Sequence, residues 1–171
     1  MKKIAASSLL LLALLTGCNE QKPTVTITQD DSRPSYKMFL ITPEKISRNG
    51  EKIGCGDGII SVPVFNEDKV DTITDKLTSA YNQLLNFKTT KPPADDQVNA
   101  LANSDLKLDS VDFKDGKATV NISGQLSLGG VCDNPRVEAQ LMTTGLQFST
   151  EVTDLEINLN GKPLKEALSL K

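Results

Sequence analysis

The feature that most constrains the fold of this chain is a pair of cysteines far apart in sequence, each within two residues of a glycine and an acidic residue. The first stretch is Gly54-Cys55-Gly56-Asp57, and the second is Gly129-Gly130-Val131-Cys132-Asp133-Asn134-Pro135-Arg136. A disulfide between them would close a loop of roughly 77 residues, which the chain-entropy model equates with about 4.5 kcal/mol of stabilisation. Because such a bond persists only in an oxidising compartment, the destination of the protein decides how these cysteines are interpreted.

The first residues are typical of an export signal. Lys2 and Lys3 precede a leucine-rich apolar run over residues 4–15, which is too short to span a bilayer comfortably. The run leads into Leu15-Thr16-Gly17-Cys18, which resembles the bacterial lipobox, where the signal is cut before a cysteine that then receives lipid. We therefore predict a lipoprotein signal peptide over residues 1–17 and a lipid anchor on Cys18. The alternative is an ordinary secretory signal in which this cysteine is incidental.

Lipidation of Cys18 would account for an odd number of cysteines. The chain has three, and the other two, Cys55 and Cys132, indicate a disulfide in an exported protein. The alternative is a metal site with two thiolate ligands. That site lacks further ligands, because the chain has no histidine and neither cysteine has a second one near it. We predict neither a metal nor a cofactor.

Charge and composition argue against nucleic acid as a partner. Loss of Lys2 and Lys3 with the signal reduces the 19 basic residues to 17, against 22 acidic residues, for a net charge of −5. A net negative charge favours solubility and opposes nonspecific binding to DNA, RNA or anionic lipid. Tryptophan is absent, so bases and large sugars find few rings on which to stack.

Residues 18–35 are predicted to form a flexible tether between the lipid and the domain. The segment is polar and contains Pro23 and Pro34, and a coil of this length spans roughly 20–25 Å. The domain would therefore stay near the membrane, on the extracytoplasmic side of the cell envelope. Asn19 follows the anchor cysteine, and the absence of aspartate there resembles an outer-membrane lipoprotein if the cell is Gram-negative. Residues 36–171 are enough for one domain.

Hydrophobic periodicity divides residues 36–171 into strands and helices. Strands are expected at 36–41, 59–65, 106–113, 118–122 and 155–159, and an amphipathic helix at about 69–87. Asp115-Gly116 predicts a hairpin turn, and Asn134 is expected to cap a second helix. This order predicts an α+β fold: a single compact domain with a mainly antiparallel sheet and two main helices on one face.

Smaller signals add detail to this prediction. A change of parity between Leu108 and Val111 indicates a β-bulge. Pro63 within the second strand indicates an edge position, because proline has no amide proton for a neighbouring strand. Gly145 costs helix propensity, so we expect a close contact between its helix and the sheet.

Several motifs together resemble one known family. They are Met38-Phe39-Leu40-Ile41, Gly54-Cys55-Gly56-Asp57, Val62-Pro63-Val64, Leu108-Asp109-Ser110-Val111, Asp115-Gly116-Lys117-Ala118-Thr119-Val120, the second cysteine stretch, Gln147-Phe148 and Asn160-Gly161-Lys162-Pro163-Leu164. Over most of residues 36–171 the chain resembles a GerMN domain, the module named after a spore germination protein, in a cysteine-containing subgroup. The resemblance implies an extracytoplasmic module, often on lipoproteins, with no established enzyme chemistry.

The joined cysteine loops form the one cluster in the sequence that could bind an ion or catalyse a reaction. The chain has no histidine, no Gly-x-Ser-x-Gly elbow and no phosphate loop. A disulfide would bring Asp57 and Asp133 together, with Arg136 close by. Two carboxylates could bind a cation or hydrolyse a glycan. The other interpretation is structural, with Arg136 pairing an acid and Asp133 lying at a helix start.

We predict that the protein is not an enzyme. The expected function is that of a membrane-anchored envelope lipoprotein whose GerMN-like module binds an envelope protein or a cell-wall polymer such as peptidoglycan. Asp57, Asp133 and Arg136 are its expected binding surface. The alternative is a cell-wall glycan hydrolase that uses Asp57 and Asp133.

Overall fold

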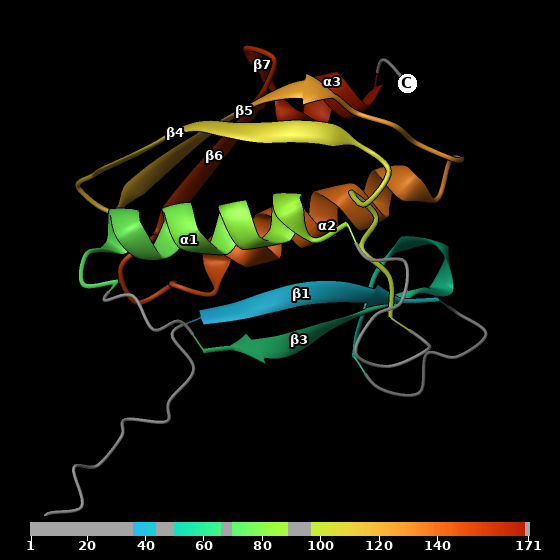
Figure 1. The fold of residues 1–171 in the computed structure, drawn as a ribbon, viewed down its shortest axis with the longest axis horizontal. Coiled ribbons are helices and arrows are strands. Elements are labelled where there is room, and N and C mark those ends of the chain that lie inside the picture. The colour runs from blue at the N-terminus through green and yellow to red at the C-terminus, as the bar shows by residue number, and fades with distance from the viewer. Residues whose placement is uncertain (1–35, 44–49, 66–69, 89–96, 170–171) are drawn as a thin grey trace, which may run out of the picture. The chain divides into compact units, whose positions relative to one another are not determined.

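A computed structural model describes residues 36–43, 50–65, 70–88 and 97–169 (Figure 1). The predicted signal peptide, Cys18 and the tether lie outside these residues. In chain order the elements are β1 (Tyr36–Thr42), β2 (Glu51–Lys52), the 3-10 turn η1 (Gly54–Gly56), β3 (Gly58–Val64), α1 (Ile73–Asn86), β4 (Asp105–Lys114), β5 (Lys117–Gln125), α2 (Asp133–Leu146), β6 (Asp154–Leu159), β7 (Lys162–Pro163) and α3 (Leu164–Ser169). The predicted strands and both main helices are therefore present, and α+β is confirmed as the fold class.

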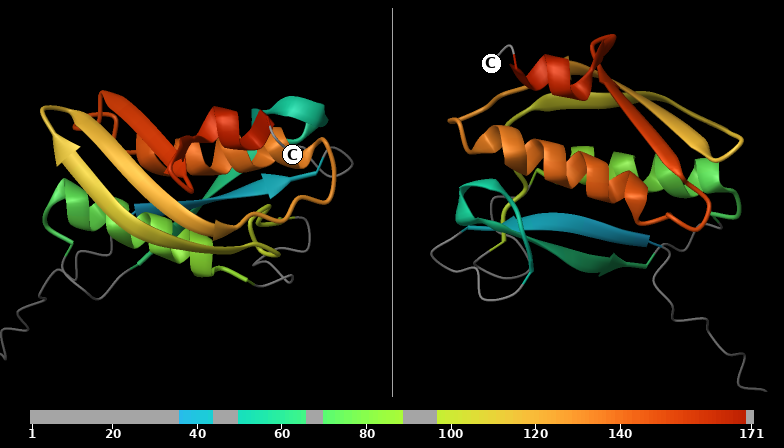
Figure 2. Two further views of the ribbon diagram at one scale, coloured as in Figure 1. Left: turned by 90° about the horizontal axis from the view of Figure 1, so that it is seen from above. Right: turned by 180° about the vertical axis from the view of Figure 1, so that it is seen from behind.

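The strands form two sheets instead of the one that was predicted. One has the order β1-β3-β2 and the other β4-β5-β6-β7. Figures 1 and 2 show α1 and α2 as a layer between the two sheets. All the strand pairs are antiparallel except β5 with β6, which is parallel. A parallel pair needs a long crossover, and α2 supplies it.

The hairpin of β4 and β5 follows the sequence closely. The register shifts between Leu108 and Ser110, which confirms the predicted bulge. Asp115 and Gly116 have φ angles of 51° and 83°, the left-handed conformation that a tight hairpin turn requires. The core-facing side of β5 is fully apolar, because its alternate residues Ala118, Val120 and Ile122 are buried.

Helix α1 begins later than its hydrophobic stripe predicted. The expected start was near residue 69, whereas the helix begins at Ile73 with Thr72 as its N-cap. The amide of Asp75 donates to the Thr72 hydroxyl at 3.1 Å, and the Thr72 amide donates to the Asp75 carboxylate at 3.3 Å. This reciprocal capping box satisfies amides that the first helical turn leaves unpaired, and so fixes the start of the helix.

Gly145 makes the close contact that its position predicted. A Cβ atom there would lie 2.6 Å from Leu155 Cδ2 on β6 and 2.7 Å from the Tyr81 hydroxyl oxygen on α1. Tyr81 is fully buried, and its hydroxyl donates to the Leu141 carbonyl at 2.9 Å. Glycine at this point therefore lets α2 approach both α1 and the four-stranded sheet.

Two glutamines of α2 and its C-terminus bond to the outer edge of β1. Gln147 accepts a hydrogen bond from the Lys37 amide at 2.7 Å and donates to the Lys37 carbonyl at 3.1 Å. Gln140 donates to the Phe39 carbonyl at 2.7 Å and accepts from the Ala100 amide at 2.8 Å. These side-chain amides bond to backbone groups that a neighbouring strand would otherwise pair. Because the later glutamine bonds to the earlier residue of β1, β1 and α2 run antiparallel.

Pro63 occupies the kind of position that its lack of an amide proton predicts. β3 lies between β1 and β2, yet β2 pairs only with Gly58 and Ile59 at the start of β3. Pro63 pairs with Lys37 of β1. Among the described strands no partner lies on its other side, so Pro63 interrupts no ladder there.

Candidate functional site

The two cysteine stretches are joined covalently. Cys55 and Cys132 form a disulfide with an S–S distance of 2.07 Å and a Cα–Cα distance of 5.8 Å, which confirms the predicted bond. The bond connects η1, just before β3, to the residue that precedes α2. Both sulfur atoms are consumed by it, so the alternative of a two-thiolate metal site does not apply.

The glycine beside Cys55 lets the two stretches approach each other. A Cβ atom on Gly54 would lie 2.8 Å from Cβ of Pro135, closer than side-chain atoms can pack. Cys55 itself has a left-handed backbone with φ of 62°, which costs energy for a residue with a side chain. The disulfide and the Gly54–Pro135 contact hold η1 against the first turn of α2.

The start of α2 differs from the prediction that Asn134 caps it. The N-cap is Cys132, whose side chain is committed to the disulfide and makes no capping hydrogen bond. Asp133 is the first helical residue, and its Oδ2 accepts a hydrogen bond from the Gly129 amide at 2.5 Å. Asn134 instead donates through Nδ2 to the Leu168 carbonyl of α3 at 3.2 Å. The N-cap thus lies at the disulfide-bonded Cys132, two residues before Asn134.

Asp57, Asp133 and Arg136 meet at this junction, as the sequence predicted. The Arg136 guanidinium donates from Nε to Asp57 Oδ2 at 2.6 Å and from Nη1 to Asp133 Oδ1 at 3.0 Å. The side chain of Asp57 is 2% exposed, that of Asp133 20% and that of Arg136 25%. These hydrogen bonds, first the one to Asp57, raise the pKa of Arg136. The three residues form one ion-paired cluster.

This geometry gives the hydrolase alternative no support. Glycosidases hold their two carboxylates apart, with the sugar and in some cases a water between them. Here a guanidinium binds both carboxylates, and Asp57 is inside the domain, where a glycan cannot reach it. Asp57 therefore acts as an internal anchor for Arg136, while Asp133 and Arg136 are only partly exposed. The cluster stabilises the junction of η1 and α2.

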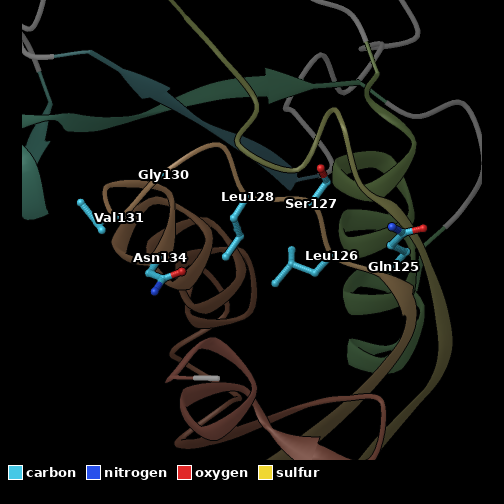
Figure 3. Close-up of a pocket in the computed structure, with 7 residues that line it drawn as sticks. All are labelled: Gln125, Leu126, Ser127, Leu128, Gly130, Val131 and Asn134. Atoms are coloured by element: carbon cyan, nitrogen blue, oxygen red, sulfur yellow. The ribbon is translucent and has the colours of Figure 1, made fainter. Parts of the chain in front are cut away.

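A pocket at the same end of the domain was not predicted from the sequence (Figure 3). Its volume is about 460 Å³, and it is lined by Gln125, Leu126, Ser127, Leu128, Gly130, Val131 and Asn134. Most of the lining comes from the irregular segment between β5 and α2, where no hydrophobic period marks a face, while Gln125 ends β5 and Asn134 belongs to α2. The available signal was Val131 itself, an aliphatic residue after two glycines in a loop.

Within the described ranges, no group of three or more carboxylates or cysteines is arranged to hold a metal ion. No helix within the same ranges combines the length and apolar character that crossing a bilayer requires. The Cys18 anchor lies outside these residues and stays a prediction.

Comparison with known proteins places the chain in a family. A family model named Germane, described as sporulation and spore germination, matches residues 56–165. No curated protein and no solved structure gives a significant match. The matched range covers more than half of the chain and contains Asp57, Cys132 and Arg136. This match confirms the resemblance drawn from the motifs: the chain belongs to the Germane family, the GerMN-type domains of sporulation and spore germination.

Proposed function

We propose that this Germane protein is a noncatalytic binding or assembly module of the cell envelope, acting on an envelope protein or a cell-wall polymer. The observation that carries the proposal is the Arg136 guanidinium between Asp57 and Asp133. Because the guanidinium binds both carboxylates, the residues that the sequence offered as a catalytic pair form a structural ion-paired cluster. The Germane family is also not a known enzyme family.

The same proposal includes a lipid anchor on Cys18. Its support is the sequence Leu15-Thr16-Gly17-Cys18 after a short apolar run. A disulfide between the other two cysteines fits an exported protein, because such bonds persist outside the cytosol. In a cell with two membranes, Asn19 favours the outer membrane as the location of the anchor.

Membrane fractionation tests the anchor. The full-length protein should sediment with membranes and carry lipid on its N-terminal cysteine in intact mass analysis. Cys18→Ser should leave an unlipidated protein that loses this membrane attachment. Equal membrane recovery of both proteins, without a lipid mass, would remove the anchor from the proposal.

Binding and catalysis can be separated with one set of proteins. The full-length protein should crosslink to an envelope protein or sediment with purified cell wall, and it should leave the muropeptide composition of that cell wall unchanged. Asp57→Asn provides the catalytic comparison. Glycan cleavage by the unaltered protein that this variant lacks would overturn the noncatalytic function.

A further inference from the structure

The disulfide between Cys55 and Cys132 joins two residues with unlike surroundings. Cys55 is exposed, and so are the other two residues of η1. Cys132 is half-buried at the start of α2, and Val137 in the same helix is fully buried in the core. Figure 2 shows the teal segment that contains η1 at one end of the domain, beside the start of α2. A reagent in solution therefore has freer access to the bond from the η1 side.

Exchange of this bond with an external thiolate has a direction. The thiolate forms a bond to one sulfur, and the other sulfur leaves as a thiolate. Which sulfur is attacked depends on access and on how well each leaving thiolate is stabilised. Because Cys55 is the exposed residue of the pair, access favours attack on Cys55 Sγ.

The backbone at Cys55 favours opening of the bond from the same side. Its φ of 62° is left-handed, which is unfavourable for a residue with a side chain. Gly54 and Gly56 lie on either side of it, and glycine lets the chain change conformation at little steric cost. Detachment of Cys55 from Cys132 removes one of the constraints that hold this strained conformation.

Cys132 is placed to leave as a thiolate. It is the N-cap of α2, and its side chain makes no capping hydrogen bond. The N-terminus of a helix stabilises a nearby negative charge, and cysteine thiolates form readily there. The neighbouring carboxylates oppose this charge, but Arg136 binds both of them, Asp133 at 3.0 Å and Asp57 at 2.6 Å. The Gly129 amide also donates to Asp133. Attack on Cys55 therefore releases the sulfur whose thiolate the helix can stabilise.

A second connection at this junction stays in place when the disulfide opens. Arg136 bonds to Asp57 beside η1 and to Asp133 in α2, so an ion pair spans the same two stretches as the disulfide. Asp57 is buried, and its ion pair is therefore screened less than an exposed one. This ion pair keeps the two cysteines near each other after the sulfur–sulfur bond is broken, so the bond can close again.

We propose that the disulfide is an exchange site for the reduced dithiol of a partner protein, with Cys55 as the sulfur attacked and Cys132 as the leaving thiolate. A partner thiolate bonds to Cys55 Sγ while the Cys55–Cys132 bond breaks, and Cys132 keeps the electron pair. The partner's second thiolate then attacks the partner sulfur of the mixed disulfide and releases Cys55. The partner is oxidised to a disulfide, both cysteines of this chain are reduced, and they take up the two protons that the partner's thiols lost.

A dithiol suits this site better than a single thiol. The Cα atoms of Cys55 and Cys132 are 5.8 Å apart in the closed bond, so the Cys132 thiolate begins next to the mixed disulfide. From there it can expel a single thiol and form the original bond again. The second thiol of a dithiol is also held beside the mixed disulfide, and it competes with this reclosure. The inference goes beyond the proposed function and does not depend on the Cys18 anchor.

Two variants measure access to each sulfur separately. Cys132→Ser and Cys55→Ser, each combined with Cys18→Ser, leave one cysteine, which is converted to a mixed disulfide with 5-thio-2-nitrobenzoate. Reduced glutathione attacks the protein sulfur and releases this coloured thiol, and it should do so at least about tenfold faster at Cys55 than at Cys132. In urea the two rates should be similar. Equal rates in the folded chains, or a faster rate at Cys132, would overturn the inference.

The folded state of these variants is controlled in the same experiment. Trimethylamine N-oxide stabilises folded chains, and circular dichroism in its presence records that each variant is folded. The titration of the free thiols then tests the leaving group. Thiolate absorbance should appear at a lower pH in folded Cys55→Ser than in urea, because the remaining Cys132 is at the helix N-terminus. Its appearance at the same or a higher pH would remove Cys132 as the leaving group.

The intact full-length protein provides a check in which both cysteines are present. An excess of a thioredoxin-type protein whose second cysteine is replaced by serine attacks the disulfide but cannot complete the reduction. After N-ethylmaleimide is added, peptide mass analysis should find this protein attached to Cys55 and the maleimide on Cys132. Attachment mainly to Cys132, or no attachment to either cysteine, would contradict the inference. Because this measurement needs no membrane, its result is independent of the Cys18 fractionation.

Discussion

Arg136 connects the two stretches that the disulfide also joins. It binds the buried Asp57 near η1 and Asp133 at the start of α2. Removing one partner of a buried ion pair is more costly than removing an exposed one, because the remaining charge stays out of water. The different exposures of the two carboxylates therefore predict different effects of their loss.

Arg136→Leu should lower the free energy of unfolding by about 2–3 kcal/mol, because Asp57 then lacks its guanidinium in a buried position. Asp133→Asn should cost about 1 kcal/mol or less, since water reaches that side chain. Urea unfolding followed by circular dichroism measures both values. Equal losses in the two variants would contradict an anchoring role for Asp57.

Tyr81 predicts a defined alkaline limit of stability. Burial raises the pKa of both tyrosines of the chain, Tyr36 and Tyr81. Unfolded tyrosine ionises near about pH 10, so above that pH the unfolded chain loses protons before the folded one does. The free energy of unfolding is therefore unaffected below this pH and falls as the pH rises above it.

The measurement uses Tyr36→Phe, in which Tyr81 is the remaining tyrosine. Tyrosinate absorbance and loss of circular dichroism should appear together in one alkaline transition. Tyr81→Phe should weaken the dependence of stability on alkaline pH. Ionisation of Tyr81 in a chain that keeps its full circular dichroism would show that the ring is accessible in the folded state.

At the scale of elements, the contact between β1 and α2 depends on hydrogen bonds from two side-chain amides. Gln140 is fully buried and connects Phe39 of β1 with Ala100, whereas Gln147 makes its bonds at a partly exposed position. Backbone groups that lose a partner inside the protein cannot bond to water, but those near the surface can. Loss of the buried Gln140 should therefore cost more stability than loss of the partly exposed Gln147.

Gln140→Leu should lower the free energy of unfolding by about 3 kcal/mol, because it leaves the Phe39 carbonyl and the Ala100 amide unpaired. Gln147→Leu should cost about 1 kcal/mol or less. Hydrogen exchange provides a second readout, and the Ala100 amide should lose protection in the first variant only. Similar stability for both variants would mean that water reaches the Phe39 carbonyl and the Ala100 amide once Gln140 is lost.

Local signals explain which elements were predictable. The hairpin of β4 and β5, its bulge and its turn depend on neighbouring residues, and all three followed from the sequence. The start of α1 differs from the prediction because the apolar spacing extends back to Val70, whereas the capping box of Thr72 and Asp75 begins the helix at Ile73. The start of α2 depends on a covalent bond to a residue 77 positions away, which no local pattern contains.

At the scale of the whole molecule, the division into two sheets was not predictable from periodicity. An alternating strand shows that one of its faces is buried, but not which sheet contains it. The cluster of Asp57, Asp133 and Arg136 was predictable because the disulfide itself was. The burial of Asp57 and the pocket depend on packing between distant segments, and they required the structure.

Reduction of the disulfide should destabilise the whole domain. The entropy of a loop this long corresponds to about 4.5 kcal/mol, and loss of a native disulfide from a small exported domain usually costs about 2–5 kcal/mol. Urea unfolding with and without reductant measures the difference. The double variant Cys55→Ser, Cys132→Ser is the control, because reductant should leave its stability unchanged. Equal stability of the oxidised and reduced protein would show that the ion-paired cluster and packing suffice.

The disulfide also determines how the protein responds to force. Tension applied between residue 36 and residue 169 passes through the sulfur–sulfur bond and bypasses the chain between Cys55 and Cys132, which includes β3, α1, β4 and β5. This segment cannot be extended while the bond is intact. Because the two cysteines are 77 positions apart, full unfolding in an optical trap should release about 270 Å less chain than after reduction. A module held by a tether on one side and a partner on the other could be stretched at its ends, yet much of its core would stay within a closed covalent ring.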